Sequence, residues 1–202
     1  RGAGDDGGGG GTGGGSGPPA NAPPQHIVAS NSKAVRAVPD GRMSGSSRCS
    51  NLSVMNYRHA YHAGNFADVL KHVVLMMLVE HLKKKPAPFF YLDTHAGGGT
   101  YDLSLGESQR SGEYKNGIGR LLEFPEAALA PELADYVRLV KACAGAGRSA
   151  ITAYPGSPTI VGRMRRSTDR MVLAETHARE ALALRSTLGR QKLVSIVESD
   201  GY

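Results

Sequence analysis

Apolar residues recur at helical spacing in four segments of this chain. The first, NFADVLKHVVLMMLVEHLKKK, has Asn65 in the position of an N-cap, basic residues in its last turn and Pro86 directly behind it. In the third segment, Ser157 precedes Pro158, so its hydroxyl could cap a helix that has proline in its first turn. We therefore predict helices over 65–85, 131–144, 158–166 and 177–189.

Short apolar runs lie between these helices. FFYLD at 89–93 and RMVLAE at 170–175 have the length and the nearly continuous apolar character of strands that are buried on both faces. KLVSIVESDGY at 192–202 is a third such run, and SAITAYPGSP at 149–158 is an extended segment that leads into a tight turn. Strands that alternate with helices are typical of an α/β fold with a parallel sheet, which is the fold class we predict.

The first 54 residues differ in composition from the rest. They hold 13 of the 27 glycines and 5 of the 11 prolines and show no apolar periodicity, so they cannot bury enough surface to offset the entropy of ordering. We predict that residues 1–54 are a disordered Gly/Pro-rich tail that the fold does not need. The sequence starts with Arg1, and we expect translation to begin at Met55, with a transit peptide as the alternative. Residues 55–202 would then be the folded part.

Charge and cysteine content narrow the possible partners. Residues 55–202 carry 19 Lys and Arg against 15 Asp and Glu, a mild basic excess that is compatible with nucleic acid. Arg163, Arg165 and Arg166 could contact RNA or form a solvated helix face. The two cysteines have no paired spacing, which favours a reducing, cytoplasmic location. Because no apolar run approaches the length of a membrane span, we expect no membrane association.

Several histidines raise the question of a metal site. His59 and His62 are three residues apart, but no cysteine or carboxylate stands at ligand spacing beside them. We therefore expect no metal, and hydrogen bonding within a turn is the simpler interpretation of both side chains.

Three consecutive glycines, Gly97 to Gly99, follow Asp93 within six residues. A P-loop would need a lysine after the glycines, and a dinucleotide fold would need G-x-G-x-x-G with an acid about 20 residues on; both are missing. The pattern Asp-x-x-x-Gly-x-Gly after a strand fits the S-adenosylmethionine-dependent methyltransferases instead. In such proteins acids at the ends of later strands contact the ribose and the adenine, and Glu175 and Asp200 stand at two such positions.

Five segments carry a resemblance to a known family. They are YRHAYHAGNFADVLKH (57–72), YLDTHAGGGTYDL (91–103), YPGSP (154–158), LAETH (173–177) and ESDG (198–201). In this order and spacing they resemble the bacterial 23S ribosomal RNA adenine-N6 methyltransferases of the RlmJ type, over nearly all of residues 55–202. The resemblance implies a Rossmann-like methyltransferase fold, S-adenosylmethionine as methyl donor and 23S ribosomal RNA as partner, and we expect a monomer. It also implies a small helical insertion at about 104–150, which accounts for the long separation between Asp93 and Glu175.

The resemblance also implies roles for individual residues. Tyr57 matches a tyrosine linked to handling of the target RNA. The carboxylate of Glu175 could accept both ribose hydroxyls, and a glycine after Asp200 would let backbone approach the adenine ring. The positions that the resemblance assigns to cofactor contact are His72, His95, Ser157, Glu175, Asp200 and Gly201.

One expected motif is missing from the sequence. Methylation of an adenine N6 is difficult because the lone pair of the amine is delocalised into the ring, and enzymes of this class hold the flipped base against an Asp-Pro-Pro-Tyr type motif. The Pro-Pro pairs here, Pro18-Pro19 and Pro23-Pro24, do not follow an aspartate, and the expected place lies beyond Tyr202. We predict a C-terminally truncated member, incomplete at its C-terminus and inactive by itself, with a sheet edge unpaired where a fourth strand belongs. A non-catalytic RNA- or cofactor-binding remnant is the alternative, and a nicotinamide oxidoreductase is a distant third.

Overall fold

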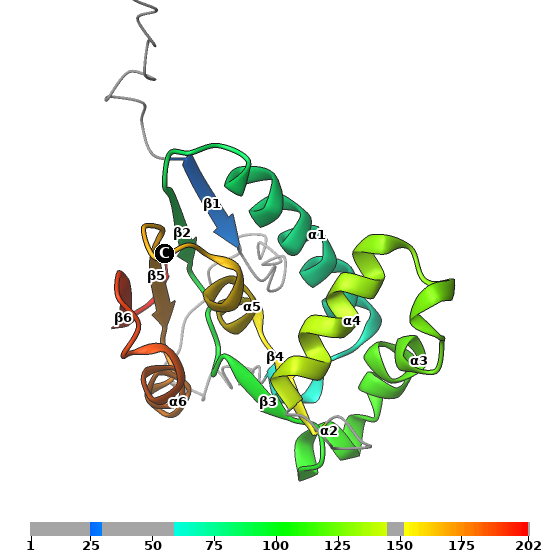
Figure 1. Cartoon of the computed structure of the whole chain (residues 1–202). Helices are drawn as coiled ribbons and strands as arrows, with labels where there is room; N and C mark the ends of the chain where they lie inside the picture. The colour runs from blue at the N-terminus through cyan, green and yellow to red at the C-terminus, as the bar shows by residue number, and fades with distance from the viewer. Residues whose placement is uncertain (1–24, 30–58, 145–151, 202) are drawn as a thin grey trace, which may run out of the picture.

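Four parallel strands form the main sheet, in the order β1-β2-β5-β6 (Figure 1). They are β1 (Gln25–Ala29), β2 (Phe89–Asp93), β5 (Arg170–Glu175) and β6 (Val194–Glu198). This computed structural model describes residues 25–29, 59–144 and 152–201. The parallel pairing confirms the α/β class, and β2, β5 and β6 confirm the strands that the three apolar runs predicted.

Strand β1 departs from the sequence prediction. It pairs with β2 in a register that runs from Gln25 opposite Phe89 to Ala29 opposite Asp93. The segment QHIVA contains two adjacent β-branched residues, which favour extended backbone, and the edge of β2 offers N–H and C=O groups that need partners. Residues 25–29 therefore form a strand within the segment for which the sequence predicted disorder. Residues 1–24 and 30–58 lie outside the described part of the chain.

Three helices build a core against one face of the sheet: α1 (Phe66–Lys83), α5 (Ser157–Met164) and α6 (Ala178–Leu188). Tyr91 of β2 and Leu173 of β5 point into this core, where they meet Val79 of α1, Val161 of α5 and Leu184 of α6. All five side chains are fully buried. The sheet is therefore fixed to the helices through the alternate residues of its strands.

The helix ends agree with the sequence at one place and differ at two others. Asn65 caps α1 by accepting a hydrogen bond from the backbone N–H of Asp68, as predicted, and α6 ends at Leu188, one residue before the predicted limit. Ser157 is not a cap: Gly156 holds that position, and Ser157 is the first residue of α5 because its hydroxyl bonds elsewhere. Within the described ranges, no helix is long and apolar enough to cross a membrane.

Between β2 and α5 the chain is mostly helical. The predicted helix 131–144 is confirmed within this stretch, but the extended segment predicted at 149–158 does not join the parallel sheet. Its described part pairs antiparallel in a separate two-stranded sheet, because Tyr101 and Tyr154 lie opposite each other and are buried in a second core. The elements are β3 (Thr100–Asp102), α2 (Gly106–Ser111), η2 (Glu113–Asn116), α3 (Ile118–Leu122), η3 (Glu126–Ala128), α4 (Pro131–Ala144) and β4 (Ala153–Pro155).

Helix α1 takes part in both cores (Figure 1). Leu75 and Val79 belong to the core beneath the sheet, whereas Met76 belongs to the second core together with Tyr136 of α4. The short 3-10 turn η1 (His59–Tyr61) leads into this helix. Because α1 contributes to both cores, the residues that precede it lie between the main sheet and the mostly helical segment that joins β2 to α5, here called the helical stretch.

Two arginines tie loops together at the amino ends of the strands. Arg166 donates to the carbonyl of Ala87 (2.9 Å) and pairs with the buried carboxylate of Asp169 (3.0 Å). Arg165 donates to the carbonyls of Lys192 (2.7 Å) and Asp169 (2.8 Å). Arg165 and Arg166 thus bond to loop backbone, which the sequence did not predict, and contact of these arginines with RNA stays a prediction.

Candidate functional site

The three glycines after β2 form a turn that has no room for side chains. Gly97 and Gly99 have φ angles of 64° and 78°, in the left-handed region that L side chains rarely adopt. A Cβ at Gly97 would collide with the hydroxyl of Tyr101, and one at Gly98 with the carboxylate of Glu180. The turn therefore presents bare backbone, as the glycine cluster predicted.

Asp93 ends β2 with a buried carboxylate. Its Oδ2 accepts hydrogen bonds from Ser157 Oγ (2.7 Å) and from the hydroxyl of Tyr91 (2.8 Å), and its Oδ1 accepts from the backbone N–H of His95 (3.2 Å). Burial raises the pKa of Asp93, and the hydrogen bonds offset this only in part. Ser157 thus joins the start of α5 to the end of β2.

Glu175 ends β5 and holds the glycine turn. One of its oxygens accepts from the backbone N–H of Gly97 (2.8 Å), and the other accepts from the backbone N–H of His177 (2.9 Å) and lies 3.0 Å from Nδ1 of that histidine. Burial would raise the pKa of Glu175, but the bonds from His177 and Gly97 outweigh it, so the pKa is lowered. The side chain is an ionised acceptor at the carboxyl edge of the sheet.

A pocket of about 510 Å³ opens beside this turn. Its walls come from the glycine turn, from the end of β5 and the start of α6, from β3 and α2, and from η1. The volume is in the range of small-molecule sites. Carboxylates outnumber arginines in the lining, which favours a ligand with positive charge or hydroxyl donors. The acids are Asp102, Glu107, Glu175 and Glu180, and the arginines are Arg110 and Arg179.

The structure brings only part of the predicted site to this pocket. His95 and Glu175 line it, while His72, Ser157, Asp200 and Gly201 are not among the lining residues. Gly201 follows β6, and a Cβ there would collide with the carbonyl of Thr94, so the end of β6 presses against the residue after β2. Tyr57 lies outside the described residues.

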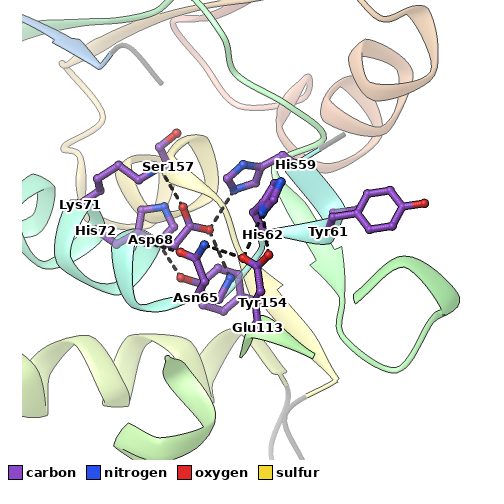
Figure 2. A network of polar contacts seen from close by, with 12 residues as sticks. His59, Tyr61, His62, Asn65, Asp68, Lys71, His72, Glu113, Tyr154 and Ser157 are labelled. Atoms are coloured by element: carbon purple, nitrogen blue, oxygen red, sulfur yellow. Dashed lines mark hydrogen bonds and ion pairs between the residues drawn. The ribbon is translucent and has the colours of Figure 1, made fainter. Parts of the chain in front are cut away.

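His72 lies in a separate polar cluster at α1 (Figure 2). Its Nδ1 is 3.0 Å from the hydroxyl of Tyr154, which is 2.7 Å from the hydroxyl of Tyr136. Burial lowers the pKa of His72 to about 4 in spite of the nearby charge of Asp68. The imidazole is therefore neutral at pH 7 and is buried among aromatic rings.

Residues 59–65 form a turn, here called the 59–65 turn, that two carboxylates hold (Figure 2). Asp68 of α1 is 2.9 Å from Nε2 of His59, and Glu113 of η2 bonds to His62 (3.0 Å) and to the amide of Asn65 (2.9 Å). His59 and His62 therefore form hydrogen bonds, as predicted, but their side-chain partners Asp68 and Glu113 lie outside the turn. His59 also lines the pocket.

Sequence reasoning missed both carboxylates. The spacing Asn65-x-x-Asp68 is that of a capping box, which is a local signal that an acid reaches back over the helix start. Glu113 is 48 positions from Asn65 and carries no such signal. Across the described residues, no three His, Cys, Asp or Glu side chains come together in a group that could hold a metal ion.

The chain is similar to known proteins in sequence and in fold. Residues 86–202, more than half of the chain, match the family model described as Ribosomal RNA large subunit methyltransferase D, RlmJ. The chain belongs to the RlmJ family. Its parallel sheet with a glycine turn after β2 is accordingly the sheet of a Rossmann-like methyltransferase.

Curated relatives in the RlmJ family include proteins of Haemophilus influenzae and Escherichia coli K12, each named Ribosomal RNA large subunit methyltransferase J. They are 44% and 40% identical over 149 residues, which cover 74% of this chain and 52% of each relative. The crystal structure of a Legionella pneumophila Philadelphia 1 protein assigned to the family DUF519 superposes with a TM-score of 0.61 and 38% identity. That match covers 69% of this chain and 50% of the other. The chain thus spans about half the length of the curated relatives it matches.

Proposed function

We propose that this chain carries the cofactor-binding part of an S-adenosylmethionine-dependent methyltransferase that acts on an adenine N6 of 23S ribosomal RNA. The observation that supports it most is the bond from Gly97 to Glu175, which fixes a bare glycine turn to a strand-end carboxylate beside a pocket in an RlmJ-family chain. The names of the two relatives make ribosomal RNA of the large subunit the proposed substrate. Such a substrate makes the cytoplasm the proposed location.

The residues at the pocket fit S-adenosylmethionine. That cofactor supplies an activated methyl group and carries a sulfonium, an ammonium and two ribose hydroxyls. The acidic lining suits its positive charge. Glu175 already accepts bonds from Gly97 and His177, but a carboxylate has about four lone-pair sites, so capacity remains for ribose hydroxyls.

The other assigned residues enter the proposal in different ways. Asp200 is exposed after β6, at the same edge of the sheet as Glu175, and it remains a proposed cofactor contact together with Gly201 and His95. Ser157 is engaged with Asp93, and His72 with Tyr154. We therefore propose that Ser157 and His72 support the site through Asp93 and Tyr154 and do not line the pocket.

Titration calorimetry with S-adenosylmethionine at pH 7 tests the proposal through Glu175→Gln. The substitution keeps the shape of the side chain but removes its charge, and loss of a charged acceptor costs about 1.5 to 3 kcal/mol. We expect affinity to fall roughly 10- to 150-fold. Glu80→Gln is the matched control, because Glu80 is exposed on α1 and pairs only with Lys83 among its recorded contacts. Equal affinity of the two variants would exclude Glu175 from the cofactor site.

A further inference from the structure

Asp68 is an acid buried in the first turn of α1. Its side chain is 2% exposed. Oδ2 lies 2.9 Å from Nε2 of His59 and accepts from the backbone N–H of Gly64 (3.2 Å), while Oδ1 lies 3.0 Å from Nζ of Lys71 (Figure 2). One carboxylate therefore contacts the first residue of η1, the backbone of the 59–65 turn and a lysine in the next turn of α1.

Two of these three partners can only donate. A backbone N–H and a lysine ammonium have no lone pair to offer, so the group between them must be an acceptor. Burial raises the pKa of Asp68, but the hydrogen bond from His59 and the positive charge of Lys71 hold it well below its usual range. The ionised carboxylate has no hydrogen to give, and the hydrogen between it and His59 must belong to the histidine.

The 59–65 turn is held on its other side by the helical stretch. Ser108 donates to the carbonyl of Ala60 (2.8 Å), and Glu113 bonds to His62 and Asn65. These contacts act on the backbone and on the outer residues of the turn. The His59 ring bonds to Asp68 through Nε2, and it lies 5.0 Å from the ring of Tyr101.

We propose that Asp68 is a positioning residue that fixes His59 in the pocket wall as the Nε2–H tautomer. This inference rests on the proposed function, since it concerns the same pocket. In the neutral Nε2–H tautomer, Nδ1 is a hydrogen-bond acceptor.

A purely structural role makes a different prediction. Asp68 stands where an acid stabilises a helix N-terminus, and a carboxamide would lose that charge but could still accept from Gly64. Stability would then fall with no change in the tautomer of His59. The state of the imidazole therefore separates positioning from helix stabilisation.

The test is long-range ¹H–¹⁵N NMR of the histidine rings in the chain of 202 residues, for the unaltered protein, Asp68→Asn and Glu113→Gln. We expect the Nε2–H pattern for His59 in the unaltered protein and a mixture of tautomers in Asp68→Asn, because an amide can donate as well as accept. In Glu113→Gln the signals of His62 should move and those of His59 should stay. His72 signals report whether each variant is folded.

Two outcomes would overturn the proposal. One is an Nδ1–H pattern for His59 in the unaltered protein, which needs no variant to fold. The other is an unchanged His59 pattern in Asp68→Asn with His72 signals intact. The spectra need no cofactor, so a failure of the proposed function is seen separately, as absent S-adenosylmethionine binding by the unaltered protein.

Discussion

Buried carboxylates in this protein differ in the donors that surround them. Asp68 and Asp93 are each 1% exposed. Asp93 meets two neutral hydroxyls and a backbone N–H, and burial raises its pKa. Asp68 meets the ammonium of Lys71 and the ring of His59, and these hold its pKa far below the usual range. The protein therefore keeps one buried acid charged by pairing it with a lysine ammonium and leaves the other among neutral partners.

His72 should make the protein sensitive to mild acid. Its pKa is about 4 in the folded chain, against an ordinary value of 6.5, so between these values the unfolded chain binds more protons. The free energy of unfolding should therefore fall as the pH falls from 6.5 to about 4, by about 3 kcal/mol in total at roughly 1.4 kcal/mol per pH unit. Urea unfolding at pH 7, 5.5 and 4.5 measures this.

His72→Gln is the control for that measurement, because an amide can still bond to Tyr154 but does not titrate in this range. Its stability should depend less on pH than that of the unaltered protein. Asp68 does not complicate the comparison, because its contribution to the free energy of unfolding is lost only at pH values below 3.8, the ordinary pKa of an aspartate. Parallel pH curves for the two proteins would contradict the assignment of the effect to His72.

At the scale of elements, the sequence predicts structures that depend on local signals. Helix α4 begins at a proline and has an apolar stripe along one face, and α1 has an N-cap at Asn65. These signals lie within the helices or next to them. Strand β3 has three residues and forms because Tyr101 lies opposite Tyr154 of β4, which is far from it in the sequence. β1 likewise exists through its pairing with β2. Elements that depend on a distant partner carry too little local pattern to be predicted.

The role of β1 can be tested by two truncations. A chain that begins at Met55 lacks β1, so the edge of β2 loses a parallel partner. We expect it to melt at least about 2 to 4 °C lower, the equivalent of 1 kcal/mol for a domain of this size, and to scatter more light on heating. A chain that begins at Gln25 keeps the strand and should melt like the full chain. If all three melt together, the β1–β2 pairing does not contribute to stability.

The candidate site was predictable to the extent that it depends on strand ends. Glu175 was predicted because acids after parallel strands meet at one edge of the sheet, and it does bond to the glycine turn. Asp68 and Glu113 were not, since their roles arise from packing of the helical stretch against the 59–65 turn. Ser157 was predicted as a cap and is instead a partner of Asp93.

At the scale of the whole molecule, one face of the sheet is packed more fully than the other. Phe89 and Tyr91 point into the core with α1, α5 and α6, whereas Phe90 and Leu92, which alternate with them, are only partly buried. The outer side of α1 is also apolar, with Phe66 73% exposed. These surfaces should bind a hydrophobic dye such as ANS in the native state of this chain.

A methyl-transfer assay tests the proposed need for an Asp-Pro-Pro-aromatic motif. Residues 1–202 contain no such motif, and a flipped adenine needs a carboxylate to accept from its amine. Purified chain should incorporate no tritiated methyl into unmodified 23S RNA above a no-enzyme control. Incorporation would require another acid; Asp68 and Asp93 are poor candidates, because both are buried and hydrogen-bonded.

Two long-range contacts, one at the 59–65 turn and one at His72 of α1, also bear on how the chain folds. Glu113 is 51 positions from His62, and Tyr154 is 82 positions from His72, so both contacts close long loops. Closing such loops is slow compared with forming a helix, because the chain loses conformational entropy before the distant contacts form and stabilise it. Helix α1 can form early on a nascent chain, but the His59 wall of the pocket cannot be in place until the helical stretch has emerged and collapsed. Assembly of the pocket is therefore a late kinetic event, and it should coincide with the slowest phase of refolding.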